Sequence, residues 1–438
     1  MGHIAQGKDV FEELGHKIDG LGTRAPFNDT FYEILKELYT PEEAELVVGM
    51  PYGLSTIAEI SKATKINGDR LRGLLEGLCN KGLVMDLWLN DEYRYSVSPM
   101  VIGIFEFTMM RVGEPANSKR WAKLFERYLS ESDAFYAANF GHGEQVSVMR
   151  TVPHEETLRE EAYLEILDFE QAEAIIRGSE KCAIGLCSCR HEKRHNGTQA
   201  CDTPLEMCST FNYGADYMIR RNLAKEVSTE RMLANLAEAR DRGLVLNADN
   251  VQKNVTFMCL CCKCCCNALA GISKHGYSNA VVTSNYIAEP ACESCTGCGK
   301  CARLCPVDAI EMVSVSSAGA KMKKRPQVDE SLCLGCGVCS LKCPAGSMKL
   351  VRRRKRVIVP ETTFCKIILA GLERGTLQNQ LFSDPQRLSQ KFLRAFVGGF
   401  LRLPPVKRAL MSDTVRSRFL SFLEKGARKQ GKGWAVDL

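Results

Sequence analysis

Cys295-Thr-Gly-Cys298-Gly-Lys-Cys301-Ala-Arg-Leu-Cys305-Pro306 and Cys333-Leu-Gly-Cys336-Gly-Val-Cys339-Ser-Leu-Lys-Cys343-Pro344 are the two stretches that decide how this chain is interpreted. Each follows the spacing C-x2-C-x2-C-x3-C-P. Three cysteines at two-residue intervals can surround one iron–sulfur cube, whereas the fourth is set off by three residues and a proline and is carried away from it. Zinc knuckles also use C-x2-C pairs. The doubled order and the two prolines favour iron–sulfur clusters over zinc.

This doubled spacing resembles that of the bacterial two-cluster ferredoxins, in which the last cysteine of each motif binds the cluster of the other motif. The resemblance implies a ferredoxin-like domain over residues 285–350 with two [4Fe-4S] clusters. It also implies the ligand sets, which are Cys295, Cys298, Cys301 and Cys343 for one cluster and Cys333, Cys336, Cys339 and Cys305 for the other. Cys292 lies three residues before Cys295 and is an alternative first ligand.

Length and composition indicate a multi-domain protein of a reducing compartment. The chain has 438 residues, of which 45% are hydrophobic and 22 are cysteines. A disulfide scaffold is expected in short secreted chains, but this chain is long and its first residues form no apolar signal segment. No run of residues reaches the ~18 consecutive apolar positions that a membrane-spanning helix needs. We therefore expect a cytoplasmic protein whose thiols are metal ligands.

The N-terminal segment, residues 1–144, shows helical periodicity followed by a hairpin pattern. The predicted helices cover 29–39, 55–65 and 70–80, and the predicted strands cover 83–89 and 93–97. This order resembles a winged helix-turn-helix, a family that inserts its second helix into the DNA major groove. Here that helix carries Arg70 and Arg72 against Asp69 and Glu76, which is a weak basic footprint. We therefore expect this segment to pack on the chain or to bind protein, and not nucleic acid.

The middle segment, residues 145–284, alternates helical and strand patterns and predicts a small α/β or α+β domain. The expected helices cover 155–177 and 228–243, and the expected strands cover 182–187, 244–246 and 255–258. The first of these strands ends at the first cysteines of a second cysteine-rich region, so we expect metal ligands at its end.

Eleven cysteines lie between residues 182 and 266, in runs that include Cys187-Ser-Cys189-Arg190 and Cys259-Leu-Cys261-Cys262-Lys-Cys264-Cys265-Cys266. Thiolates select iron–sulfur clusters, zinc or copper(I), and the neighbouring motifs favour one or two further iron–sulfur clusters. We expect one centre to use Cys187, Cys189, Cys201 and Cys208, and another to draw on Cys259, Cys261, Cys262, Cys264, Cys265 and Cys266. Structural zinc with buried free thiols is the alternative. His191 and His195 are interpreted as solvated side chains.

The C-terminal segment, residues 351–438, is basic and helical. Between Arg387 and Lys432 it has twelve Lys or Arg residues and two acidic ones, although the whole chain carries a net charge of only +6. Helices are expected over 364–372, 388–403 and 406–423, and apolar residues recur every fourth position from Leu388 to Phe400. Such helices can lie on an anionic membrane, occupy a partner's groove or fold back on their own domain. The sequence leaves these three alternatives open.

Taken together, the segments predict a multi-domain α+β protein: winged-helix-like domain, cysteine-rich α/β domain, two-cluster ferredoxin-like domain and basic amphipathic helical tail. The combination resembles the dicluster ferredoxin-domain proteins of anaerobes, which implies cluster binding and single-electron transfer to or from a partner oxidoreductase. The sequence contains no phosphate-binding glycine loop and no dinucleotide fingerprint. Two alternatives remain open, a reductase with an active-site cluster in the middle domain and a redox-sensing DNA-binding regulator. Whether the chain is itself an enzyme also stays open. Its expected partners are a redox protein and, through the tail, the inner face of a membrane.

Overall fold

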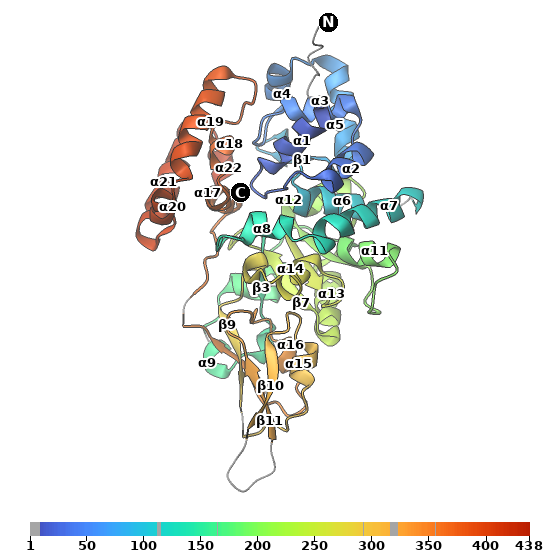
Figure 1. Cartoon of the computed structure of the whole chain (residues 1–438), viewed down its shortest axis with the longest axis vertical. Coiled ribbons are helices and arrows are strands. Elements are labelled where there is room, and N and C mark those ends of the chain that lie inside the picture. The colour runs from blue at the N-terminus through green and yellow to red at the C-terminus, as the bar shows by residue number, and fades with distance from the viewer. Residues whose placement is uncertain (1–8, 112–114, 164, 292, 316–322, 355) are drawn as a thin grey trace, which may run out of the picture. The chain divides into compact units, whose positions relative to one another are not determined.

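The computed structural model describes residues 9–111, 115–163, 165–291, 293–315, 323–354 and 356–438. The chain separates into two compact units, one formed by residues 1–139 together with 362–438 and the other by residues 140–361 (Figure 1). The first unit thus joins most of the predicted N-terminal domain to the tail, and the second joins the cysteine-rich segment to the ferredoxin-like segment. The helices and sheets of the described residues, one sheet of six strands and three of two, agree with the predicted mixture of α and β structure.

The first unit begins with the expected helices and hairpin. Its elements are α1 (Val10–Asp19), α2 (Asp29–Leu38), α3 (Pro41–Gly49), α4 (Ile57–Thr64), α5 (Gly68–Lys81), β1 (Val84–Leu89), β2 (Glu92–Val97), α6 (Phe105–Met110), α7 (Pro115–Glu126) and α8 (Ala134–Phe140). Thr40 and Thr56 form capping boxes that start α3 and α4. Asn90 and Asp91 both have positive φ, as a two-residue hairpin turn requires. Local sequence signals therefore determine these boundaries.

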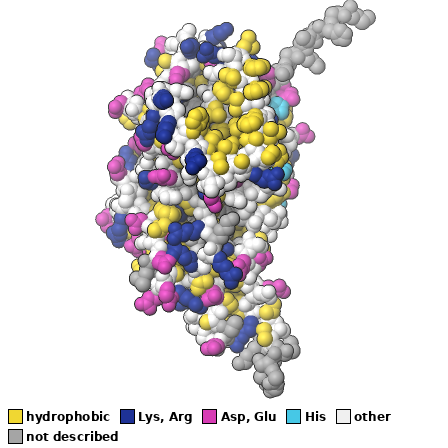
Figure 2. Space-filling view, turned by 90° about the vertical axis from the view of Figure 1, so that its left-hand side faces the viewer, with side chains coloured by type: hydrophobic (Ala, Val, Ile, Leu, Met, Phe, Trp, Pro, Cys, Tyr) yellow, Lys and Arg dark blue, Asp and Glu magenta, His cyan; other side chains and the backbone are white. Residues whose placement is uncertain are grey.

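The C-terminal helices complete the first unit. They are α17 (Thr363–Arg374), α18 (Leu377–Leu381), α19 (Leu388–Leu401), α20 (Pro404–Met411), α21 (Asp413–Lys429) and α22 (Gly433–Val436). Their shared core contains Ile368, Leu372, Leu377 and Leu401. Figure 2 shows the side of the molecule on which hydrophobic side chains of these helices gather at the surface. None of the helices in the described ranges combines the length and apolar character that crossing a bilayer requires.

The second unit is built on a six-stranded antiparallel sheet with the strand order β3-β7-β8-β5-β4-β6. Its strands are β3 (Met149–Val152), β4 (Cys182–Leu186), β5 (Glu206–Phe211), β6 (Ala224–Val227), β7 (Val245–Asp249) and β8 (Phe257–Cys261). Its longer helices are α11 (Ser188–His195), α12 (Asn212–Arg220), α13 (Thr229–Arg242) and α14 (Asn267–Ser273). The strand predicted over 182–187 and the helix predicted over 228–243 are both present. The latter is capped by Ser228 and ends at Gly243, whose φ is 68°.

The single helix expected over 155–177 is wrong. The structure has four short pieces there, at Glu155–Thr157, α9 (Glu160–Tyr163), Asp168–Glu170 and α10 (Ala172–Arg177). Leu158 forms a bridge with Leu350, and the backbone N–H of Arg159 donates to the Leu350 carbonyl at 3.0 Å. A backbone committed to that contact cannot continue a helical hydrogen-bond ladder, so a tertiary contact overrides the local helical propensity.

The cluster motifs lie in a small repeated arrangement at the end of the second unit. Strands β9 (Tyr286–Pro290) and β12 (Met348–Arg352) pair, as do β10 (Ile310–Val315) and β11 (Lys323–Val328). Each motif ends in a short helix, α15 (Lys300–Leu304) or α16 (Val338–Leu341), that follows a left-handed glycine. In the second motif, Gly335 has a φ of 68°, and any Cβ at this position would overlap the Tyr286 carbonyl. Glycine is therefore required where the motif loop meets the strand.

Candidate metal centres

The cysteines assigned to the second cluster line one small enclosed cavity. Its thiols come from both motifs, as the ferredoxin resemblance implies, and its other walls are largely apolar. The lining residues are Cys305, Cys333, Cys336, Cys339, Ala288, Pro306, Val307, Ile310, Leu334, Gly335, Gly337 and Leu350. All four cysteines are buried. Four thiols around a largely apolar cavity fit a [4Fe-4S] cluster, which supplies one-electron chemistry when bound.

Burial makes three of these thiols, Cys305, Cys336 and Cys339, poor acids in the absence of a metal. Desolvation raises the pKa of Cys336 to about 12, and it also raises the pKa of Cys305 and Cys339. A buried thiolate therefore needs a nearby cation for compensation. Coordination to iron would provide that charge and would hold the sulfur as a thiolate. The backbone N–H of Ala309 also donates to the Cys305 sulfur at 3.2 Å, which favours its anionic form.

The cysteines assigned to the first cluster are closer to solvent. Cys298 is exposed, and Cys295, Cys301 and Cys343 are half-buried. Charge interactions join both Cys298 and Cys301 to Cys343, the cysteine that the crossed pattern assigns to them. A hydrogen bond from the Lys300 backbone lowers the pKa of Cys298. This group therefore has the ligands for a cluster near the surface. Cys292, the alternative first ligand, lies outside the described residues.

The buried ligand group adjoins the cysteine-rich part of the same unit. The His154 backbone N–H donates to the Cys336 carbonyl at 3.1 Å, and the Ser284 N–H donates to the Leu334 carbonyl at 2.9 Å. Lys263, which lies inside the Cys259–Cys266 run, forms an ion pair with Asp308, three residues after Cys305. The two ligand groups thus differ in position, since one faces solvent and the other contacts the middle region.

A second collection of thiols lies where strands of the large sheet end. Short-range interactions that shift the thiol pKa values join Cys208 to Cys259, Cys259 to Cys261, Cys261 to Cys266 and Cys266 to Cys189. Cys187 interacts electrostatically with Cys189, Cys259 and Cys261. We call these six cysteines the six-thiol group. Cys259 and Cys261 are two residues apart on β8, so their side chains share one face of the sheet. Antiparallel pairing then brings β4, β5 and β8 together at this end.

The six-thiol group has the properties of a binding site for a polynuclear centre. Its members are half-buried or buried, and burial raises the pKa of Cys187 to about 12. The pKa of Cys189 is raised well above its usual value, first by its hydrogen bond with Cys266 and then by burial. Six soft ligands in one place exceed what a single tetrahedral ion uses. The group therefore suits an iron–sulfur cluster.

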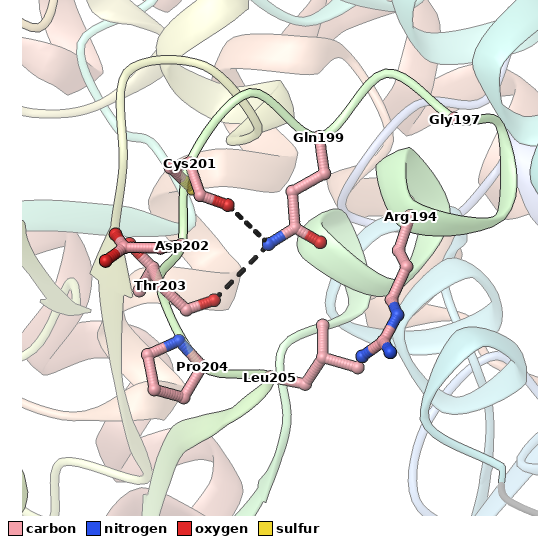
Figure 3. Close-up of a pocket in the computed structure, with 8 residues that line it drawn as sticks. All are labelled: Arg194, Gly197, Gln199, Cys201, Asp202, Thr203, Pro204 and Leu205. Carbon is pink, nitrogen blue, oxygen red and sulfur yellow. Dashed lines mark hydrogen bonds between the residues drawn. The ribbon is translucent and has the colours of Figure 1, made fainter.

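A surface cavity of about 430 Å³ lies beside the loop that carries Cys201 (Figure 3). It is lined by Arg194, Gly197, Gln199, Cys201, Asp202, Thr203, Pro204 and Leu205. The Gln199 side-chain amide donates to the carbonyls of Cys201 at 3.0 Å and Thr203 at 3.3 Å. These bonds fix the loop in a turn that places Cys201 against the run after β8.

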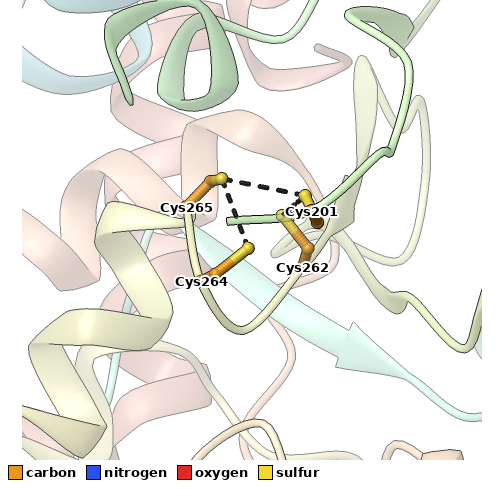
Figure 4. Close-up of side chains that lie close together, drawn as sticks. All are labelled: Cys201, Cys262, Cys264 and Cys265. Carbon is orange, nitrogen blue, oxygen red and sulfur yellow. Dashed lines mark hydrogen bonds between the residues drawn. The ribbon is translucent and has the colours of Figure 1, made fainter. Parts of the chain in front are cut away.

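Four further thiols converge where the Cys201 loop meets the turn after β8 (Figure 4). The sulfurs of Cys201, Cys262, Cys264 and Cys265 all lie within 4.8 Å of one another. The pKa of Cys262 falls to about 5, chiefly because Cys265 donates a hydrogen bond to its sulfur and also because of the positive charge of Arg190. Arg190 is almost fully buried and donates to the carbonyls of Leu260 and Pro204. We call these four cysteines the thiol quartet.

The structure divides the cysteines differently from the expected grouping. Cys187, Cys189 and Cys208 lie with Cys259, Cys261 and Cys266, whereas Cys201 lies in the quartet. One signal in the sequence could have predicted this division. Side chains alternate between the two faces of a strand, so Cys259 and Cys261 on β8 point away from their neighbour Cys262. Cys182 lies in the hydrophobic core. His191 and His195 contact each other, with 2.9 Å between their Nε2 atoms.

Comparison with known proteins adds one match. No curated protein and no solved structure matches the chain. Residues 294–347, which include all eight cysteines of the two C-x2-C-x2-C-x3-C-P motifs, match the family model of the 4Fe-4S dicluster domain.

Proposed function

We propose that this chain is an iron–sulfur electron-transfer protein that exchanges single electrons with a partner oxidoreductase. In this proposal the solvent-facing ligand group of the dicluster domain meets the partner, and the buried group faces a further redox centre held by the six-thiol group. The observation that carries the proposal is the difference in burial between the two ligand groups, together with the contacts of the buried one.

Positive charge around the solvent-facing ligand group supports the proposal that this group meets the partner. Lys300 and Lys324 are exposed near it, and Arg303 donates to the Cys298 carbonyl at 3.2 Å. Arg325 donates to the Cys295 carbonyl. A basic rim around an accessible ligand group favours a redox partner with an acidic face, because complementary charge increases the rate of productive encounter.

The N-terminal helices give less support to the DNA-binding alternative. Arg70 on α5 contacts Glu42 at 2.8 Å, and Lys81 at the end of α5 contacts Glu43 at 2.7 Å. Carboxylates so close to these cations oppose the phosphate contacts on which DNA affinity depends. We therefore propose that the winged-helix-like segment contacts protein.

A reductase is the second candidate, and the cavity beside Cys201 is the observation that favours it. Its volume of about 430 Å³ falls in the range of small-molecule sites, which is roughly 300–1,000 Å³. In this alternative a small substrate would bind there and receive electrons from the middle region. A substrate-dependent change in the spectrum of the reduced protein would distinguish it from pure electron transfer.

The proposal is tested by iron and acid-labile sulfide analysis, with electron paramagnetic resonance of the reduced protein, after anaerobic purification. Two cubes account for about eight irons, and a centre in the six-thiol group raises the content above that value. Cys266→Ser should lower iron and sulfide together and remove one reducible signal, whereas Cys182→Ala, a core cysteine of the same sheet, should change neither. An iron content of about eight that Cys266→Ser does not alter would contradict the third centre.

A further inference from the structure

The thiol quartet has the dimensions of a site for one metal ion. The Cys201 and Cys262 sulfurs are 3.7 Å apart, those of Cys201 and Cys265 are 4.0 Å apart, and those of Cys264 and Cys265 are 3.4 Å apart. Metal–sulfur bonds of about 2.3 Å in a regular tetrahedron require sulfurs ~3.8 Å apart. The observed separations lie on both sides of this value.

We infer that Cys201, Cys262, Cys264 and Cys265 bind a single tetrahedral ion of the zinc or iron(II) class, and not an iron–sulfur cube. A cube attaches each thiolate to a different iron, so its ligands must stand farther apart than the ligands of one ion. The quartet sulfurs are in mutual contact and leave no space for four irons and four sulfides. Tetrahedral thiolate coordination suits both zinc and iron.

The residues around the quartet can compensate the negative charge of a thiolate-bound ion. Four thiolates around one divalent ion leave a net negative charge, and the buried guanidinium of Arg190 lies beside Cys262 to offset it. The chain closes a turn here, because the Cys266 N–H donates to the Cys262 carbonyl at 3.2 Å. That turn presents three of the four ligands, and the Gln199-braced loop presents the fourth.

An ion at this position would join two segments that are far apart in the sequence. It would fix the Cys201 loop to the turn between β8 and α14, next to Cys261 and Cys266 of the six-thiol group. The quartet ion is thus a positioning element for the neighbouring redox centre. This inference does not depend on the proposed electron transfer, since a single ion binds here whether or not the six-thiol group holds a cluster.

The test compares the full chain with Cys264→Ser, because Cys264 is the exposed member of the quartet and its substitution disturbs no core. We expect the variant to lose one zinc or one iron per chain with unchanged acid-labile sulfide. Cobalt(II) added to protein depleted of this ion should give the visible absorption of tetrahedral thiolate cobalt in the wild type and not in the variant. Elemental analysis decides between zinc and iron.

Two further variants test the metal site if Cys264→Ser folds poorly. Cys264→His should retain the ion, because imidazole replaces a thiolate in tetrahedral sites. Cys182→Ala should retain both the ion and the cobalt spectrum. Loss of about four irons and four sulfides in Cys264→Ser would overturn the inference in favour of a cube. An unchanged metal content and cobalt spectrum would overturn it as well.

A different observation concerns the tail. Leu388, Phe392, Phe396 and Phe400 lie four residues apart along α19 and are 80%, 70%, 70% and 55% exposed. The opposite face of the helix is already used, since Val397 and Leu401 pack in the core of the tail helices. Figure 2 shows hydrophobic side chains gathered on this side, with Lys and Arg at the edges. Monomeric soluble proteins rarely expose such a contiguous row.

The geometry points to an anionic lipid surface as the occupant of this face. Exposed cations lie along and at both ends of the row, at Arg387, Lys391 and Arg402, and α21 carries the exposed Arg418 and Lys425. Phenylalanines on one side and cations at the borders are the pattern of helices that lie in the membrane interface. Anionic headgroups attract such cations. The face would thus hold the protein at a membrane without crossing it.

Flotation of the full chain with phosphatidylcholine vesicles, with and without phosphatidylglycerol, tests this second inference. We expect binding to the anionic vesicles that the pair Phe392→Ser and Phe396→Ser weakens at least tenfold. Trp88→Ser, which removes another exposed aromatic of the same unit, should bind as the wild type does. Absence of wild-type binding would overturn the inference. A wild-type dimer that the double variant converts to a monomer, without vesicle binding, would instead assign the face to a second copy of the chain.

Discussion

Replacing Gly335 by alanine should destabilise the buried ligand group of the dicluster domain far more than a matched glycine substitution nearby. Gly335 has a φ of 68°, and a Cβ there would overlap the Tyr286 carbonyl oxygen and the Ser284 hydroxyl. The left-handed conformation alone costs an alanine about 1–2 kcal/mol. Overpacking against a fixed backbone adds roughly 1–3 kcal/mol. The expected total for Gly335→Ala is therefore about 2–5 kcal/mol.

Gly346→Ala isolates the conformational part of that cost. Gly346 has a φ of 59° in the same domain, but nothing lies within 4 Å of the position that its Cβ would take. We expect Gly346→Ala to cost only about 1–2 kcal/mol. The difference of about 1–3 kcal/mol corresponds to a rate ratio of roughly 5 to 150 if the strain is relieved as the loop opens.

The assay is the rate at which the iron–sulfur absorption of anaerobic protein bleaches in moderate denaturant, with bound iron measured before and after. Gly335→Ala should bleach faster than Gly346→Ala by the ratio above, and should contain less iron as purified. Equal bleaching rates and equal iron contents for the two variants would refute the reasoning. That result would mean that close approach of the motif loop to Tyr286 does not limit retention of the cluster.

Three further outcomes follow from the same structure. Reversing charge with Lys300→Glu and Arg303→Glu should slow the reduction of this protein by an acidic ferredoxin at least tenfold at low salt, and high salt should remove the difference. Stopped-flow absorbance measures the rate, and Lys225→Glu, at another exposed lysine, is the control. Burial raises the pKa of Glu106 from 4.5 to about 7, so the folded state holds a proton that the unfolded state releases, and stability should fall as pH rises through this window. Glu106→Gln should flatten that fall in urea unfolding. Air oxidation should release iron from the dicluster domain in two phases, the first absent in Cys298→Ser, because the thiols of the second ligand group are all buried whereas Cys298 of the first is exposed.

The dicluster domain could be predicted from sequence because the spacing of its cysteines is a local feature. Within each motif two residues separate each of the first three cysteines from the next, and glycines with positive φ at positions such as 297 and 335 permit the loop around them. The charge interactions of Cys298 and Cys301 with Cys343 follow the crossed pattern that the ferredoxin resemblance implies. Such features depend little on the rest of the fold.

The grouping of the middle-region cysteines depends on contacts that the sequence does not display. Cys208 reaches Cys259 because β5 pairs with β8, and Cys201 reaches Cys262 because a loop folds back over the end of that strand. Both contacts join residues more than fifty positions apart. The alternation of side chains along each strand could be predicted from the sequence, but the order of the strands in the sheet could not. That order decides which thiols lie close together.

The two cluster motifs have the same spacing but different surroundings, and the residues between the cysteines explain why. The first motif carries Lys300 and Arg303, which are exposed, whereas the second carries Leu334 and Val338 at 2% and 3% exposure. Charged side chains keep one loop at the surface, and apolar ones pull the other into the core. Lys300 and Val338 occupy the same position in the two motifs, so exchanging them should leave both ligand sets intact but weaken the contact between the dicluster domain and the middle region. The intervening residues, and not the shared spacing, thus determine where each ligand group faces.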